Sequence, residues 1–130
     1  MTVTVPGRWQ QQPLDPRGVS WVADDQALIT LVGIGFSIKA PPPIEYLKVR
    51  GSPTKDSYLR IALETLQHPT GQLAAESVEF HGEDPRRPFR VLRVLRHAQA
   101  LIILKLDADQ WVSSRVGSEY AAAFASLGEL

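Results

Sequence analysis

The sequence predicts an α+β domain, in which a mainly antiparallel β-sheet is flanked by helices. Two β-rich runs, 89–96 and 100–107, are separated by a short polar break and lead into an Ala-rich amphipathic segment. This order is typical of a strand, a turn, a second strand and a closing helix. A third apolar and β-branched run, 27–38, fits a central strand with both faces covered. The length predicts a single domain, 1–130.

Composition excludes several classes of function. Fourteen basic and fourteen acidic side chains cancel, so no general attraction to nucleic acid or to an anionic membrane is expected. Cysteine is absent, which rules out disulfides and cysteine-ligated metals. The start of the chain does not read as a signal peptide, and the apolar runs are too short to cross a bilayer. We therefore expect a cytoplasmic protein that does not associate with a membrane.

The first half of the chain begins irregularly, with one short strand over 8–12 and a second over 19–23 that ends at a turn at Asp24 and Asp25. Within the strand 27–38, Gly33 and Gly35 share one face, where we expect another group to pack close to the backbone. Three consecutive prolines end this strand. A short helical turn over 44–49 follows.

A helix is predicted next. Ser52 is a suitable cap and Pro53 suits the first helical position. His68 and Pro69 mark its end. Between these limits the apolar residues follow a helical period, at positions 58, 59, 61, 62, 63 and 66.

The second half contains one ambiguity. A strand over 74–80 and a polar loop over 81–87 are clear, but the apolar residues of 88–102 also fit one face of a helix. We favour the two strands because Val91, Val94 and Ile103 give a high β-branched density, while a helix stays open. The final helix covers 112–127, and Asp109 suits its N-terminal cap.

Motifs for catalysis or metal binding are weak. The glycines at 33 and 35 match only half of a dinucleotide fingerprint, and no helix follows them. The histidines are far apart; His81 with Glu83 and Asp84, and Asp107 with Asp109, are the best local groups, and we interpret them as loop or cap residues. No Gly-x-Ser-x-Gly elbow occurs. The sequence thus predicts no catalytic residue, no metal site and no cofactor.

The residues that we single out for partner binding are basic or aromatic. Six basic side chains lie within 86–97. One interpretation is a contact surface for nucleic acid or an acidic protein. The other is a set of ion pairs with Glu76, Glu79, Glu83 or Asp84. The alternation of side chains along a strand would divide these residues between the two faces of the sheet. We therefore favour ion pairs over a single contact surface. Tryptophans near loops are either core or interface residues. The candidates are Arg90 and Arg96 on one face, Arg93 on the other, and Trp9, Trp21 and Trp111.

The overall layout resembles a known family. The opening Pro6-Gly-Arg-Trp9, the phrase Ala27-Leu-Ile-Thr-Leu-Val, and the C-terminal hairpin followed by a helix ending in Ser126-Leu127 are similar to the α/β/α family shared by the nuclear-import factor Mog, the PsbP proteins of photosystem II, and the bacterial DcrB-like and Eag-type secretion chaperones. The resemblance implies an α/β/α sandwich around an antiparallel sheet. It also implies members that act mostly by binding other proteins.

The function that follows is a non-enzymatic protein-binding module, an adaptor or a secretion-type chaperone whose partner is another protein. Two alternatives stay open. One is nucleic-acid binding through 86–97, and the other is a small-ligand pocket near Gly33, Gly35 and Trp21. Formation of a homodimer also stays open.

Overall fold

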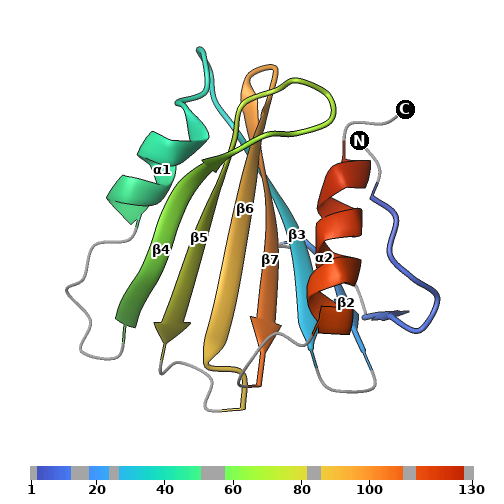
Figure 1. Ribbon diagram of the computed structural model, residues 1–130. Helices are drawn as coiled ribbons and strands as arrows, with labels where there is room; N and C mark the ends of the chain where they lie inside the picture. Colours follow the sequence, from blue (N-terminus) through green and yellow to red (C-terminus); the bar gives the residue numbers. More distant parts are fainter. Residues whose placement is uncertain are drawn as a thin grey trace.

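The computed structural model describes residues 3–12, 18–23, 27–50, 58–81, 86–109 and 114–127. They form an antiparallel sheet with two helices (Figure 1). The elements, in chain order, are β1 (Gln10–Gln11), β2 (Val19–Val22), β3 (Leu28–Gly35), α1 (Pro43–Arg50), β4 (Tyr58–Leu66), β5 (Ala74–His81), β6 (Phe89–His97), β7 (Ala100–Ala108) and α2 (Ser114–Ser126).

The strand order across the sheet is β1-β2-β3-β7-β6-β5-β4. The pairing of β3 with β7, from Leu28 opposite Asp107 to Gly35 opposite Ala100, joins the two halves of the chain. Beside β3, the backbone at Gly18 approaches so closely that a Cβ atom there would lie 2.1 Å from the Leu31 carbonyl oxygen. Only glycine fits at this position.

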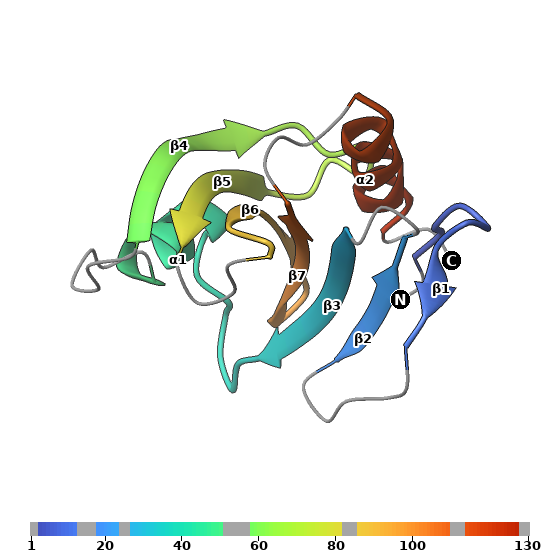
Figure 2. The ribbon, with the colours of Figure 1, turned by 90° about the horizontal axis from the view of Figure 1, so that it is seen from below.

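The two helices cover opposite faces of the sheet (Figure 2). Side chains alternate between the faces of a strand. On β6, Val91 and Leu95 therefore pack in the core beneath α2, while Leu92 and Val94 pack in the core beneath α1. We call these two sides the α2 face and the α1 face. The fold is thus the predicted α/β/α sandwich.

The helix α2 packs through one apolar stripe, as its sequence period predicts. Val116, Tyr120, Ala123, Phe124 and Leu127 are all buried. The Tyr120 hydroxyl donates to the backbone carbonyl of Leu104 on β7. Burial raises the pKa of this hydroxyl far above its usual value.

Helix α1 begins inside the proline run. Pro43 is its first residue, where the missing N–H of proline costs no hydrogen bond. The side chain of Leu47 is fully buried against the α1 face. This short helix confirms the helical turn predicted for 44–49 and extends it by one residue at each end.

The structure confirms the strands predicted from the second half of the chain. The run 88–102, for which a helix stayed open, instead belongs to the strand pair β6 and β7, and their ladder extends from Phe89 opposite Ala108 to His97 opposite Ala100. Both strands contribute residues to the cores on both faces. Because both faces are covered, apolar residues do not alternate strictly along β6, which explains the ambiguous pattern.

The helix predicted from Ser52 to His68 is wrong. Residues 58–66 form the strand β4, and Ser52 and Pro53 lie outside the described residues. The register of β4 against β5 shifts between Arg60 and Ala62, which is a β-bulge. An extra residue at Ile61 moves the later apolar positions by one, so the strand's alternation is lost and the pattern imitates a helix.

Two smaller expectations also change. The first strand is limited to Gln10–Gln11. No group packs tightly on the central glycines: a Cβ at Gly33 would meet Ile102 Cδ1 at 3.8 Å, and one at Gly35 would meet nothing within 4 Å. Both glycines are exposed, so there is room beside them for a side chain. The turn at Asp24 and Asp25 lies outside the described residues, as do 110–113, so capping of the final helix by Asp109 stays a prediction.

Candidate functional site

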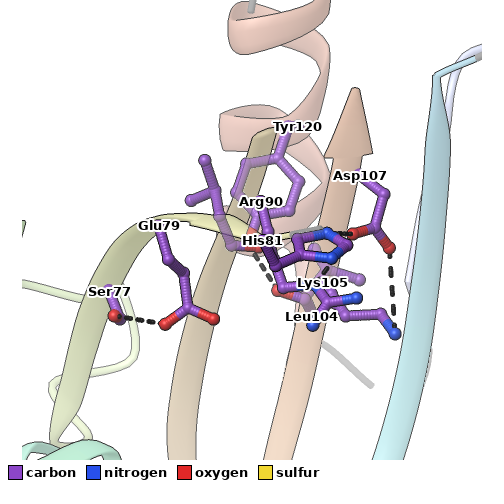
Figure 3. A network of polar contacts seen from close by, with 9 residues as sticks. Ser77, Glu79, His81, Arg90, Leu104, Lys105, Asp107 and Tyr120 are labelled. Carbon is purple, nitrogen blue, oxygen red and sulfur yellow. Dashed lines mark hydrogen bonds and ion pairs between the residues drawn. The ribbon is translucent and has the colours of Figure 1, made fainter. Parts of the chain in front are cut away.

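Charged side chains gather on the α1 face at the end of β5, β6 and β7 that lies opposite the β6–β7 turn (Figure 3). Asp107 is at the centre: its Oδ1 lies 2.8 Å from Arg90 Nε and 3.5 Å from His81 Nε2, and its Oδ2 lies 3.8 Å from Lys105 Nζ. Arg90 faces Asp107 directly across the β6–β7 ladder. We call these four residues the Asp107 cluster.

A second polar group lies further along the same face. Ser77 Oγ donates to Glu79 Oε2 at 2.9 Å and accepts from Arg60 Nε at 3.1 Å. Arg60 also donates to the backbone carbonyl of Leu47 at the end of α1. Both Ser77 and Glu79 are fully buried. Arg60 therefore connects β4, β5 and α1 through one side chain.

These polar groups fit a structural role better than a chemical one. The Asp107 carboxylate is shared among cations, which leaves its charge compensated. The hydroxyl of Ser77 is bonded to Glu79 rather than to a histidine. Among the described residues, neither ring nitrogen of His81 has a hydrogen-bond partner, and Asp107 Oδ1 lies 3.5 Å from Nε2. Within the described ranges, no three histidine or carboxylate side chains gather where they could hold a metal ion.

The three candidate arginines are divided between the two faces. Arg90 pairs with Asp107 on the α1 face. On the α2 face, Arg93 pairs with Glu76 at 2.7 Å, and its guanidinium lies 5.3 Å from the ring centroid of Tyr120. The sequence correctly predicts this split, and the pairing of Arg93 with Glu76 agrees with the ion-pair interpretation. Arg90 pairs with Asp107, a residue that this interpretation does not include among the partners, and Glu83 and Asp84 lie outside the described residues. The structure does not bring the arginines together.

Two of the candidate tryptophans are core residues. Trp9 is 4% exposed and Trp21 is 9% exposed, and both belong to the core beneath α2. Trp111 lies outside the described residues. A role for these tryptophans in partner binding stays a prediction, and neither Trp9 nor Trp21 presents a large surface in this structure.

The residues of the expected ligand pocket are also separated. Trp21 faces Ile29 across the β2–β3 ladder. Gly33 is four residues further along β3, which at about 3.3 Å per residue is about 13 Å away. The structure thus offers no common lining for a ligand between Trp21 and the glycines.

The open edge of the sheet carries exposed apolar side chains. On β4, Leu59 is 62% exposed, Ile61 is 49% exposed, and Ala62 is also exposed. Leu59 lies opposite Phe80 and Ala62 opposite Val78, both half-buried at the margin of the α2-face core. We call Leu59, Ile61 and Ala62 the β4 surface. It is the candidate functional site that the geometry favours, because apolar patches at an unpaired sheet edge mark contact sites.

Sequence reasoning misses this surface because it assigns 58–66 to a helix with these residues buried. The signal that could have revealed it is the β-branched and aromatic content of Tyr58, Ile61 and Thr65, followed by the turn residues Pro69 and Gly71. That pattern indicates a hairpin with 74–80.

Comparison with known proteins agrees with the architecture. The sequence matches no protein-family model, and no curated protein matches it. Among solved structures, the chain is similar to cyanobacterial PsbP (CyanoP) from Synechocystis sp. PCC 6803, with a TM-score of 0.61 and 14% identity over 91% of this chain and 79% of that one.

A second solved structure is similar to the same extent. It is LpqN of Mycobacterium tuberculosis, described as involved in cell envelope biogenesis, with a TM-score of 0.62 and 15% identity over 95% of this chain and 79% of that one. At these identities the likeness concerns the fold. The chain has the Mog/PsbP-like fold, as the layout of its sequence predicts. None of the described helices is long and apolar enough to cross a membrane.

Proposed function

We propose that this protein is a non-enzymatic protein-binding module that contacts its partner through the β4 surface. The observation that carries the proposal is the exposure of Leu59 and Ile61 on the last strand of the sheet. Full burial of one such side chain by a partner contributes about 1.5–3 kcal/mol to the free energy of binding. Two of them beside half-buried Phe80 and Val78 offer a small but energetically useful contact.

The expected occupant is an extended segment of another protein that adds to the edge of β4. In the described part of the sheet, β4 pairs only with β5, so its outer backbone groups are available for a further strand. Apolar side chains on the α2 side of that segment would pack against Leu59 and Ile61. The bulge at Ile61 restricts regular pairing to either side of it, which favours a short segment over a long one.

This proposal agrees with the role of an adaptor or a secretion-type chaperone that the family resemblance implies. It is also consistent with the charged groups, since Arg90, Arg93 and Asp107 are engaged in ion pairs within the protein. Nucleic-acid binding through 86–97 would need these arginines on one surface.

The test is affinity capture from native lysate with a nuclease-treated sample alongside. We expect the wild type to retain a discrete protein after nuclease treatment, and the double variant Leu59→Glu, Ile61→Glu to lose it at least tenfold. Val49→Glu is the matched control, because Val49 is 80% exposed on α1. Equal capture by all three proteins, or capture that disappears with nuclease, would contradict the proposal. Light scattering of the purified protein separates a second copy of this chain from another partner.

A further inference from the structure

The two charged side chains of β4, Arg60 and Glu64, lie on opposite faces of the sheet. Arg60 is hydrogen-bonded on the α1 face, to β5 and to the end of α1. Glu64 lies opposite Glu76 of β5. Glu76 belongs to the α2 face, because its partner Arg93 lies over the ring of Tyr120 on α2. On the face that carries Leu59 and Ala62, the charge of β4 is therefore a carboxylate.

The described residues around Glu64 do not compensate this charge. Glu64 is exposed and makes no ion pair in the described part of the chain. Glu64, Glu76 and Arg93 lie side by side on three neighbouring strands. Arg93 is already engaged, since its Nε lies 2.7 Å from Glu76 Oε2 and its guanidinium packs over Tyr120 and Phe124. Like charges directly opposite each other destabilise a sheet, so a cation added beside Glu64 would be favourable.

Glu64 has a fixed spacing from the β4 surface. The pairing of β4 with β5 is regular from Ala62 to Leu66, beyond the bulge. Side chains two residues apart project to the same face, so those of Ala62 and Glu64 are about 6.6 Å apart along the strand. Ala62 is small and exposed, which leaves room beside it for a large apolar side chain. A strand added here would place one residue beside Ala62 and another, two positions away, beside Glu64.

The same carboxylate disfavours a second copy of this chain as the occupant. Antiparallel pairing of two copies through the whole regular stretch, 62–66, would be centred on position 64, because two-fold symmetry pairs residues at equal distances from the axis. Two Glu64 side chains would then face each other directly. Other registers either cross the bulge at Ile61 or extend beyond Leu66, where the strand ends. Charged side chains on edge strands commonly prevent identical edges from pairing in this way.

We propose that the segment added to β4 contains a lysine or an arginine two residues away from an aliphatic residue, and that Glu64 selects this pattern. The aliphatic residue packs beside Ala62, and the cation pairs with Glu64 and relieves its repulsion from Glu76. This inference rests on the proposed protein-binding function and deepens it by naming the chemistry of the partner segment. An exposed ion pair adds modestly to affinity, but it discriminates between partners and fixes their register.

The test uses three labelled synthetic peptides that differ only in their terminal residues. The first is Lys-Thr-Val-Thr-Val-Thr-Lys, and the others carry Glu or Ser in place of both lysines. Because each sequence is palindromic, either strand direction sets a terminal residue two positions from a valine. Titrations are followed by fluorescence anisotropy. We expect the Lys peptide to bind about fivefold more tightly than the Glu peptide, with the Ser peptide between them, and this ratio to decrease in high salt.

Charge reversal at one position distinguishes recognition by Glu64 from a general effect of charge. Glu64→Lys should reverse the order of the Lys and Glu peptides, and Glu64→Gln should remove the preference. Glu45→Lys is the control, because it changes the net charge by the same amount as Glu64→Lys while Glu45 is exposed on α1, on the other face of the sheet. It should leave the order and the ratio unchanged.

Equal binding of the Lys and Glu peptides, absence of binding, or an order that Glu64→Lys does not change would overturn the inference. A wild-type dimer in light scattering that dissociates in the variant Leu59→Glu, Ile61→Glu would overturn it in favour of a second copy. If lysate capture depends on Leu59 and Ile61 while the peptides do not discriminate charge, the proposed function stands and this inference does not. Capture that is unaffected by changing Leu59 and Ile61 contradicts the proposed function itself.

Discussion

At the scale of single residues, one ion pair attaches the N-terminal segment to α2. Arg8 Nε lies 2.9 Å from both carboxylate oxygens of Glu119, and both side chains are largely buried. Hydrogen bonds from Arg8 hold the pKa of Glu119 below its usual value, although burial acts in the opposite direction. Next to this pair, Trp9 completes the core beneath α2.

Replacing Glu119 should therefore produce a stability loss that depends on pH. Because the folded pKa lies below the unfolded value of about 4.5, the carboxylate stabilises the fold fully above the unfolded pKa, and this contribution disappears as the pH falls through the folded pKa. We expect Glu119→Gln to lower the free energy of unfolding by about 1 kcal/mol at pH 7 and to have little effect at pH 2–3.

Urea unfolding at several pH values measures this difference. Glu45→Gln is the control, since Glu45 pairs with Lys48 at 3.4 Å with both side chains more than half exposed, and such a pair contributes little. A loss for Glu119→Gln that is equal at pH 3 and pH 7 would show that the side chain acts through packing rather than through its charge.

Asp107 is the second residue whose charge should matter. Its side chain is 7% exposed and that of Arg90 is 13% exposed. Removing the carboxylate would leave a guanidinium buried without its partner, which is costly in a poorly hydrated site. We expect Asp107→Asn to lower the free energy of unfolding by about 3 kcal/mol, measured by thermal and chemical unfolding. Asp109→Asn should change it by less than about 0.5 kcal/mol, because Asp109 is exposed; similar effects at both positions would contradict this account of Asp107.

At the scale of elements, β4 is the least constrained of the strands that are eight or nine residues long. It lies at the edge, contains the bulge at Ile61, and exposes most of its side chains. By contrast, β6 and β7 lie between neighbours on both sides and contribute to both cores. Local opening requires the least free energy where few buried contacts are lost.

Hydrogen exchange should reproduce this ranking. We expect peptides covering 58–66 to exchange at least tenfold faster than peptides covering 89–97 and 100–108, measured by mass spectrometry at neutral pH. Binding of a partner strand to β4 should slow exchange in 58–66 selectively. Equal protection of β4 and β6 in the isolated protein would show that the edge is already covered.

The same difference explains which elements could be predicted from the sequence. Helix α2 is visible because Val116, Tyr120 and Phe124 form a regular stripe that no bulge interrupts. The strands β6 and β7 are recognisable from their β-branched content despite the missing alternation. The strand β4 is not, since the extra residue Ile61 changes the face of every later side chain.

The candidate sites follow the same rule. Alternation along β6 is enough to predict that Arg93 faces away from Arg90. The Asp107 cluster, by contrast, depends on the register of three strands, which no local pattern specifies. Exposed residues such as Ile38 and Leu59 cannot be distinguished from buried ones without the three-dimensional packing, because sequence shows only that they are apolar.

At the scale of the whole molecule, the sheet has one hydrophobic core on each face, and the central strands β6 and β7 contribute side chains to both cores. Leu47 is fully buried beneath α1, and Phe124 is buried beneath α2 on the other side. Alternate residues of β6 and β7 enter each core, so loss of packing on one face removes the support of the strands that form the other. The single domain predicted from the length should therefore unfold as one cooperative unit.

A single core substitution on the α1 side tests this coupling. Trp9 and Trp21 report on the α2-side core, and Leu47 belongs to the opposite cluster. We expect Leu47→Ala to reduce the free energy of unfolding measured by tryptophan fluorescence by about 2–5 kcal/mol, and Phe124→Ala, in the core beneath α2, to reduce it by about 3–5 kcal/mol. For each protein the fluorescence and far-ultraviolet circular dichroism transitions in urea should coincide. If Leu47→Ala instead leaves the fluorescence midpoint unchanged and separates the two transitions, the faces of the sheet unfold independently, and a partner bound at the β4 edge could then stabilise one face without the other.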